Sequence, residues 1–197
     1  MEIIRHRRNT LAELRATPAE YGVEVDIRSD VRAQRLIIHH DPLSAGEAFE
    51  PWLAEYRHGT LILNVKEEGL ESRLLGMMQA AGIERFFFLD QSFPFLLKTA
   101  RAHESRCAVR VSEFESIETA LALAGLVQWV WVDCFTRFPL TAADVQRLKE
   151  ANFKLCLVSP ELQGRDPELE IPALRAQLEA LNTELDAVCT KVPERWL

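Results

Sequence analysis

The stretch Gly22-Val-Glu-Val-Asp-Ile-Arg28 decides the fold, because apolar residues alternate in it with charged residues. Alternation with a period of two is typical of a β-strand, and it points the side chains of Glu24 and Asp26 to the same face. An apolar run that ends in ionisable groups predicts a strand that delivers a site. Two further runs within the first forty residues end in this way, Ile3 to His6 and Arg35 to His40.

Similar short runs recur along the rest of the chain and alternate with segments of helical spacing, such as Leu70, Leu74 and Met78. Strict alternation of strand and helix predicts an α/β fold with a parallel sheet, and about eight such units predict a compact (β/α)8 TIM barrel. The predicted strands are Ile3 to His6, Val23 to Arg28, Thr60 to Lys66, Arg85 to Asp90, Cys107 to Ser112, Trp129 to Cys134, Lys154 to Ser159 and Ala187 to Lys191.

We expect one barrel domain over residues 1–197 with short loops, since roughly 25 residues per unit is near the lower size limit of this fold. The run from Arg35 to His40 has no helix before it, so it predicts a β-hairpin after strand two. Only Pro193 to Leu197 follows the last run, which is too short for a full closing helix. Trp196 is then expected either to pack against the barrel or to meet the partner subunit of a homodimer.

The chain has a formal net charge of -7 and a pI near 5.3, which argues against a broad nucleic-acid surface. A small anionic substrate remains compatible with local Arg and Lys residues. No run approaches the roughly 18 apolar residues of a transmembrane segment, and no basic segment followed by an apolar stretch begins the chain, so a cytoplasmic protein is expected. The four cysteines are widely spaced and are predicted to be buried free thiols.

Polar side chains at the carboxyl ends of the predicted strands mark the candidate site, because the loops that follow barrel strands form the mouth. Two carboxylates on one strand face are suited to hold a divalent cation, and histidines are suited to move protons. This arrangement suits hydrolysis or cyclisation of a phosphodiester. The strand-end residues are His6, Arg7, Glu24, Asp26, Arg28, Asn64, Lys66, Asp90, Arg110, Ser112, Asp133, Ser159 and Lys191.

The order of these residues resembles that of the glycerophosphodiester phosphodiesterase-like family, which belongs to a superfamily with phosphatidylinositol-specific phospholipase C. Each motif is short, and the ordered set covers nearly the whole chain. The matching stretches are His6-Arg-Arg-Asn-Thr10, Gly22-Val-Glu-Val-Asp26, Ile38-His-His-Asp-Pro42, Leu63-Asn-Val-Lys66, Gln91-Ser-Phe93 and Asp186-Ala-Val-Cys-Thr-Lys191.

The resemblance implies that His6 and His40 form an acid/base pair and that Arg7 binds phosphate. It also implies that Glu24 and Asp26 ligate Mg²⁺ or Ca²⁺. The charge on the phosphate oxygens is expected to be neutralised by Arg7 and by Lys66, with Arg110 as a further phosphate-binding candidate. By strand alternation, His39 faces opposite to His40, and either imidazole can be the one at the mouth.

The chain departs from the family pattern at the expected metal ligands. Family members usually have His-Arg-Gly followed by Glu-Asn-Thr, whereas here Arg8 precedes Asn9 and that Glu is missing. Asn64 stands where the family has a Glu ligand, and Lys191 stands in place of an Asp. Because an amide oxygen brings no charge, a Glu24/Asp26/Asn64 site should bind a cation weakly. The alternative is that Arg8 or Lys191 supplies a fixed positive charge where the metal would lie.

The sequence therefore predicts a phosphodiester hydrolase of the glycerophosphodiester phosphodiesterase type that acts in lipid metabolism on a small phosphodiester. Two alternatives remain open: a catalytically silent barrel that binds a phosphorylated ligand, and a metal-independent phosphodiester lyase. The aromatic runs Phe86-Phe-Phe88 and Trp129-Val-Trp131 are expected either to fill the core or to line a pocket. Arg110 and Asp133 either serve the site or pair with other charges at the mouth.

Overall fold

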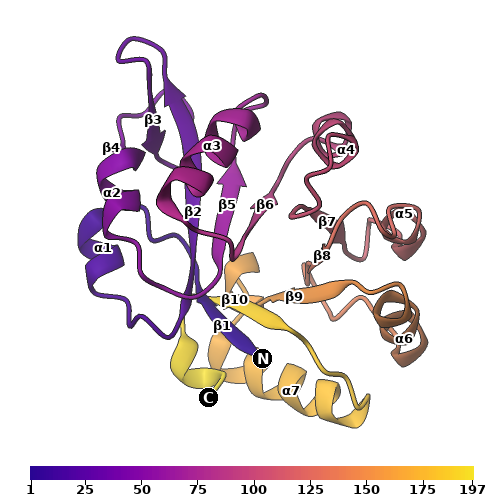
Figure 1. Ribbon diagram of the computed structural model, residues 1–197. Helices are drawn as coiled ribbons and strands as arrows, with labels where there is room; N and C mark the ends of the chain where they lie inside the picture. The colour runs from indigo at the N-terminus through magenta and orange to yellow at the C-terminus, as the bar shows by residue number, and fades with distance from the viewer.

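The computed structural model describes residues 1–197 and contains a ten-stranded sheet that helices surround (Figure 1). Eight of the strands run parallel to their neighbours and alternate with helices, which confirms the predicted (β/α)8 barrel. These strands are β1 (Glu2–Arg5), β2 (Gly22–Asp30), β5 (Leu61–Val65), β6 (Phe86–Leu89), β7 (Ala108–Val111), β8 (Trp129–Val132), β9 (Lys154–Val158) and β10 (Ala187–Thr190).

The barrel closes weakly between β6 and β7. Hydrogen-bonded ladders join β7, β8, β9, β10, β1, β2, β5 and β6 in that order, whereas β6 and β7 share one isolated bridge between Phe88 and Cys107. The residue after β6, Asp90, has a φ of 59°, and this left-handed conformation cannot continue a strand. The two strands therefore part before they reach the mouth of the barrel.

Seven α-helices and two 3₁₀ turns connect the strands. Helices α1 and α6 begin with capping boxes, made by Thr10 with Glu13 and by Thr141 with Asp144. The helices are α1 (Leu11–Arg15), α2 (Phe49–Glu55), α3 (Glu71–Ala81), α4 (Phe93–Arg101), α5 (Ile117–Leu121), α6 (Ala142–Glu150) and α7 (Pro167–Ala180), and the 3₁₀ turns are η1 (Pro160–Gln163) and η2 (Pro193–Arg195).

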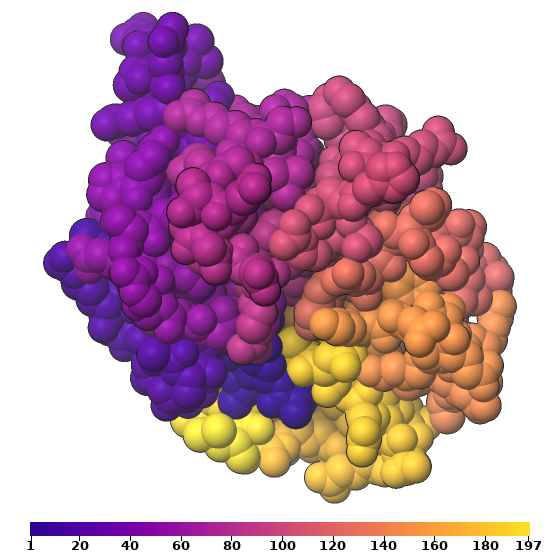
Figure 2. All heavy atoms as spheres, in the orientation of Figure 1, coloured from indigo at the N-terminus to yellow at the C-terminus, as the bar shows by residue number.

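The predicted hairpin after the second barrel strand is present. Strand β3 (Arg35–Ile38) pairs antiparallel with β2, and the short β4 (Glu47–Ala48) pairs antiparallel with β3. The β2–β3 turn projects from the body of the molecule (Figures 1 and 2). Helix α2, which follows, was not predicted. Its buried residues include Trp52, whose indole Nε1 donates a hydrogen bond of 3.0 Å to the carbonyl oxygen of Arg8. Helix α2 thus supports the loop after β1.

Two apolar layers hold the barrel together. The larger lies between strands and helices, and the smaller fills the barrel interior, where the rings of Phe87 and Trp129 stack with centroids 4.6 Å apart. Both aromatic runs are buried, so they belong to the core. Trp196 is 5% exposed and donates from its indole to Ser159 Oγ at 2.9 Å. It therefore packs against the barrel, the first of the two expected arrangements.

All four cysteines are free and buried, as predicted. None of the helices combines the length and the apolar character needed to cross a membrane.

Candidate active site at the barrel mouth

Glu24 and Asp26 lie side by side on the inner face of β2, where their side chains are 1% and 0% exposed. Glu24 accepts two hydrogen bonds, one on each oxygen. The backbone N–H of Arg7 donates at 2.7 Å, and the side-chain amide of Asn64 on β5 donates at 2.9 Å. Arg7 makes this contact with a φ of 49°, a conformation that is uncommon for a residue other than glycine. The predicted residues Glu24 and Asn64 are thus in direct contact.

Asp26 is held mainly by Asn9, which was not predicted as a site residue. Asn9 donates from Nδ2 to Asp26 Oδ2 at 2.8 Å, and its Oδ1 accepts the backbone N–H of Asp26 at 3.0 Å. Lys66 Nζ lies 3.3 Å from Asp26 Oδ1, and Arg7 Nε lies 3.5 Å from Oδ2. The sequence offers only an indirect signal for Asn9. A buried carboxylate such as Asp26 needs hydrogen-bond donors, and Asn9 is a donor close to the His6-Arg7 motif.

His6 lies at the same point, with Nε2 3.8 Å from Glu24 Oε2. Burial and then the charges of Arg7, Lys191, Lys66 and Arg8 lower the pKa of His6 from 6.5 to about 3. Burial, and secondly the charge of Asp26, raises the pKa of Glu24 from 4.5 to about 7. His6 is therefore neutral at physiological pH.

A chain of ion pairs crosses the mouth from β5 to β8. Lys66 Nζ lies 3.2 Å from Asp90 Oδ2, the Arg110 guanidinium pairs with Asp90, and Arg110 also lies 3.0 Å from Asp133 Oδ2. Although burial opposes the charged carboxylate of Asp90, Arg110 and Lys66 hold its pKa below the usual value. Of the two roles expected for Arg110 and Asp133, the structure shows the mutual pairing.

His40 lies on the rim and is 42% exposed, with Nδ1 2.7 Å from Asp41 Oδ1. Its carbonyl oxygen accepts hydrogen bonds from Arg28, and the backbone N–H of His39 donates to the carbonyl oxygen of Asp26 at 3.1 Å. No hydrogen bond or ion pair joins the His40 imidazole to His6, Glu24 or Asp26. The backbone around His40 therefore lies beside the site, whereas the His40 imidazole makes no hydrogen bond or ion pair with the other predicted site residues.

Neither of the cations expected to replace a metal forms a salt bridge. The Arg8 guanidinium donates two hydrogen bonds to the carbonyl oxygen of His6, at 3.0 and 3.2 Å. Lys191 is exposed, and its charge is one of those that lower the pKa of His6. The cation that contacts Asp26 is Lys66 instead.

The donor atoms around Glu24 fit a divalent cation in part. Glu24, Asp26 and Asn64 offer hard oxygen atoms, and Asp26 Oδ1 and Asn64 Oδ1 are buried acceptors that receive no hydrogen bond. Against this, Lys66 already lies beside Asp26, and no group of three or more His, Cys, Asp or Glu side chains forms a metal-binding cluster. The residues fit a weakly held Mg²⁺ or Ca²⁺ that would compete with the Lys66 ammonium.

Comparison with solved structures shows that this fold is shared with glycerophosphodiester phosphodiesterases. A candidate glycerophosphoryl diester phosphodiesterase from Agrobacterium tumefaciens superposes with a TM-score of 0.69 at 16% identity, covering 99% of this chain and 97% of that chain. A glycerophosphodiester phosphodiesterase from the same organism gives 0.68 at 12% identity, with 99% and 98% covered. A glycerophosphoryl diester phosphodiesterase from Parabacteroides distasonis gives 0.66 at 12% identity, with 98% and 84% covered.

No family model and no curated protein matches the sequence. The likeness to glycerophosphodiester phosphodiesterases that the motifs predicted is confirmed by these structures at the level of the fold. At such identity the comparison establishes the (β/α)8 fold, while the chemistry has to be argued from the residues of this chain.

Proposed function

We propose that this barrel hydrolyses a phosphodiester of the glycerophosphodiester type at the site built around His6 and Glu24. The observation that carries the proposal is the gathering of Arg7, Arg8, Lys66 and Lys191 around a neutral imidazole, because each of these charges lowers the pKa of His6. Such a concentration of positive charge at a barrel mouth suits an anionic phosphate.

In the proposed reaction His6 is the general base. Its neutral imidazole accepts a proton from the attacking water while the new bond from that oxygen to phosphorus forms. The bond between phosphorus and the leaving alcohol then breaks, and His40 donates a proton to the departing oxygen. The charge of the bound phosphate offsets the surrounding cations, so its binding raises the pKa of His6 and makes the imidazole a better base.

The phosphate is held by the cations of the mouth in this proposal. Arg7 offers a forked guanidinium, Lys66 an ammonium group, and Arg110 a guanidinium that Asp90 and Asp133 fix in position. Glu24, Asp26 and Asn64 would hold a divalent cation, which when bound supplies further charge neutralisation on the phosphate oxygens. Asn9 and the backbone of Arg7 orient the two carboxylates for that role.

A screen of glycerophosphodiesters, lysophospholipids and cyclic phosphates, with and without Mg²⁺, Ca²⁺ and Mn²⁺, tests the proposal. We expect release of an alcohol and a phosphomonoester by the wild-type protein and loss of turnover in His6→Ala. His103→Asn is the matched control, because His103 is exposed and lies in the loop between α4 and β7, which precedes a barrel strand and is therefore at the end of the barrel opposite the mouth. Equal rates in wild type and His6→Ala would contradict the proposal, and a chelator distinguishes the metal-dependent version from the metal-independent one.

A silent phosphate-binding barrel is the second candidate, and one observation favours it. The carboxylates of Glu24 and Asp26 already accept hydrogen bonds or form ion pairs, with Arg7, Asn9, Asn64 and Lys66 as partners. Carboxylates with such partners suit a site that binds a phosphorylated ligand without hydrolysing it. Calorimetric binding of a phosphodiester without hydrolysis in the same screen would support this candidate. The cytoplasmic location is proposed on the four free thiols, which suit a reducing compartment.

A further inference from the structure

The wall of the barrel has an opening between β6 and β7, beside the proposed site. We infer that this opening is a slot that binds a single alkyl or acyl chain attached to the substrate's phosphate, so that the preferred substrate is an amphiphilic phosphodiester. The inference rests on the proposed function for the position of the phosphate, and it adds a separate binding site for the rest of the molecule.

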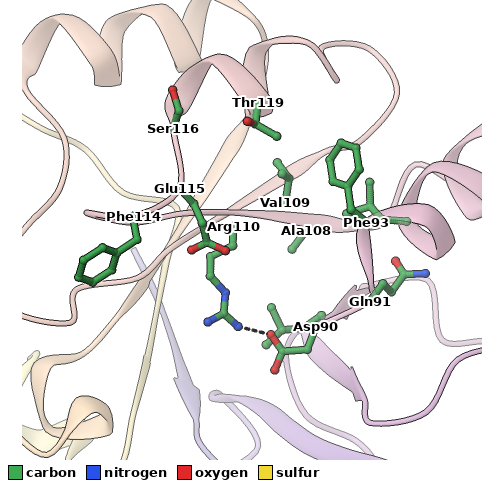
Figure 3. Close-up of a pocket in the computed structure, with 12 residues that line it drawn as sticks. Asp90, Gln91, Phe93, Ala108, Val109, Arg110, Phe114, Glu115, Ser116 and Thr119 are labelled. Atoms are coloured by element: carbon green, nitrogen blue, oxygen red, sulfur yellow. Dashed lines mark hydrogen bonds and ion pairs between the residues drawn. The ribbon is translucent and has the colours of Figure 1, made fainter.

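The parting of the two strands creates the slot. After the bridge between Phe88 and Cys107, the left-handed φ of Asp90 ends the pairing, and the backbone N–H of Asp90 has no hydrogen-bond acceptor in the protein. A cavity of about 570 Å³ occupies the space between β6, β7, α4 and α5 (Figure 3). This volume is in the range typical of small-molecule sites.

The lining shows that the slot passes through the barrel wall. Leu89 and Ala108 belong to the core inside the barrel, whereas Val109 and Leu96 belong to the core between strands and helices. In a continuous parallel ladder, side chains of these two layers are separated by the hydrogen-bonded backbone. Here they border one cavity, so a ligand can extend from the mouth to the outside of the barrel.

Charged and apolar side chains line the slot together. Its inner end holds Arg110, joined to Asp90 in Figure 3, and Arg110 shares Asp90 with Lys66 of the proposed phosphate site. Gln91 also lines the cavity, and its amide turns away from this ion pair to donate to Glu71 Oε1 at 3.0 Å and to Thr99 Oγ1 at 2.9 Å. The rest of the lining is mixed: Leu96, Ala108 and Val109 are apolar, whereas Glu115, Ser116 and Thr119 are polar. The rings of Phe93 and Phe114 lie at opposite sides of the cavity in Figure 3 and are 47% and 79% exposed.

The apolar part of the lining favours one alkyl chain over other occupants. A phosphate at the mouth leaves its substituent next to a passage whose lining is half apolar. Methylene groups in this passage would cover the exposed rings of Phe93 and Phe114. The slot is bounded by two strands of one barrel, so it admits a narrow chain. Each buried methylene should tighten binding about three- to fourfold.

Calorimetry with butyl phosphate and octyl phosphate tests the slot independently of turnover. We expect octyl phosphate to bind the wild-type protein at least about tenfold more tightly than butyl phosphate, since the additional methylenes enter the slot. Thr119→Trp places a large ring at the exposed rim of α5 and should abolish this chain-length dependence while leaving the affinity for butyl phosphate unchanged. Gln146→Trp, on the exposed face of α6, should preserve it. Ala108→Leu fills the inner part of the slot and provides a second variant.

Two results would overturn the slot: equal affinity for the two alkyl phosphates in wild type, or an undiminished preference for octyl phosphate in both Thr119→Trp and Ala108→Leu. Failure of the proposed function gives a different pattern. If the mouth holds no phosphate, inorganic phosphate and butyl phosphate would not bind, while 1-octanol would still bind wild type and lose affinity in Thr119→Trp. If the barrel binds phosphate without turnover, the alkyl phosphates would bind as expected for the slot while no phosphodiester is hydrolysed.

Discussion

Substitution of Lys66 by Met removes the charge that links the two halves of the barrel mouth. Lys66 Nζ lies 3.3 Å from Asp26 and 3.2 Å from Asp90, and its side chain is 15% exposed. At an effective dielectric constant of about 20, each pair has a gross attraction of about 5 kcal/mol, most of which desolvation offsets. Loss of one partner of a buried pair costs about 3–5 kcal/mol. Because Arg7 and Asn9 still contact Asp26, we expect Lys66→Met to lower the free energy of unfolding by about 2–4 kcal/mol.

Urea unfolding at pH 7, monitored by tryptophan fluorescence, measures this difference. The matched control is Lys98→Met, which removes an exposed lysine whose Nζ lies over the Phe95 ring and should change stability by less than about 0.5 kcal/mol. Lys66→Met should also raise the pKa of His6, since Lys66 is one of the charges that lower it. A loss of stability no larger than that of the control would refute the role given to Lys66.

Three further predictions concern the carboxylates and the rim histidines. His40→Ala should abolish turnover without loss of thermal stability, because the side chain is 42% exposed, whereas His39→Ala should retain turnover; the opposite result would assign the acid role to His39. Asn64→Glu should make the melting temperature strongly dependent on Mg²⁺ or Ca²⁺, since it places a third carboxylate beside Glu24, and no increase over wild type would remove position 64 from the cation site. The folded-state pKa of Glu24 is raised to about 7, so its contribution to stability falls as pH rises from 4.5 to 7, and the stability of Glu24→Gln relative to wild type should increase by about 3 kcal/mol over that window. Parallel stability curves for the two proteins would contradict this burial effect.

The barrel strands could be predicted because each is a short apolar run that ends in polar residues, and the observed bounds differ little from the predicted runs. Helix α2 was missed, although Phe49, Trp52, Leu53 and Tyr56 have helical spacing and are buried. The weak closure between β6 and β7 had no sequence signal that we recognised, because it depends on the backbone conformation of Asp90.

At the site, the common face of Glu24 and Asp26 followed directly from strand alternation, and the proximity of Asn64 followed from the resemblance. The role of Asn9 could not be derived in the same way, because it depends on how the loop after β1 returns to Asp26. The ion pair between Lys66 and Asp26 was also missed. Strand alternation predicts which face of the sheet a side chain lies on, but it does not predict which carboxylate the flexible lysine side chain contacts.

The most direct test of the central claim is the titration of the His6 imidazole by NMR, with and without inorganic phosphate. We expect the imidazole to stay neutral from pH 5 to 8 without phosphate, because burial and the four surrounding cations lower its pKa to about 3. Its pKa should rise when phosphate binds. A His6 that titrates near 6.5 and does not respond to phosphate would contradict the claim that the mouth is an anion site built around a neutral base.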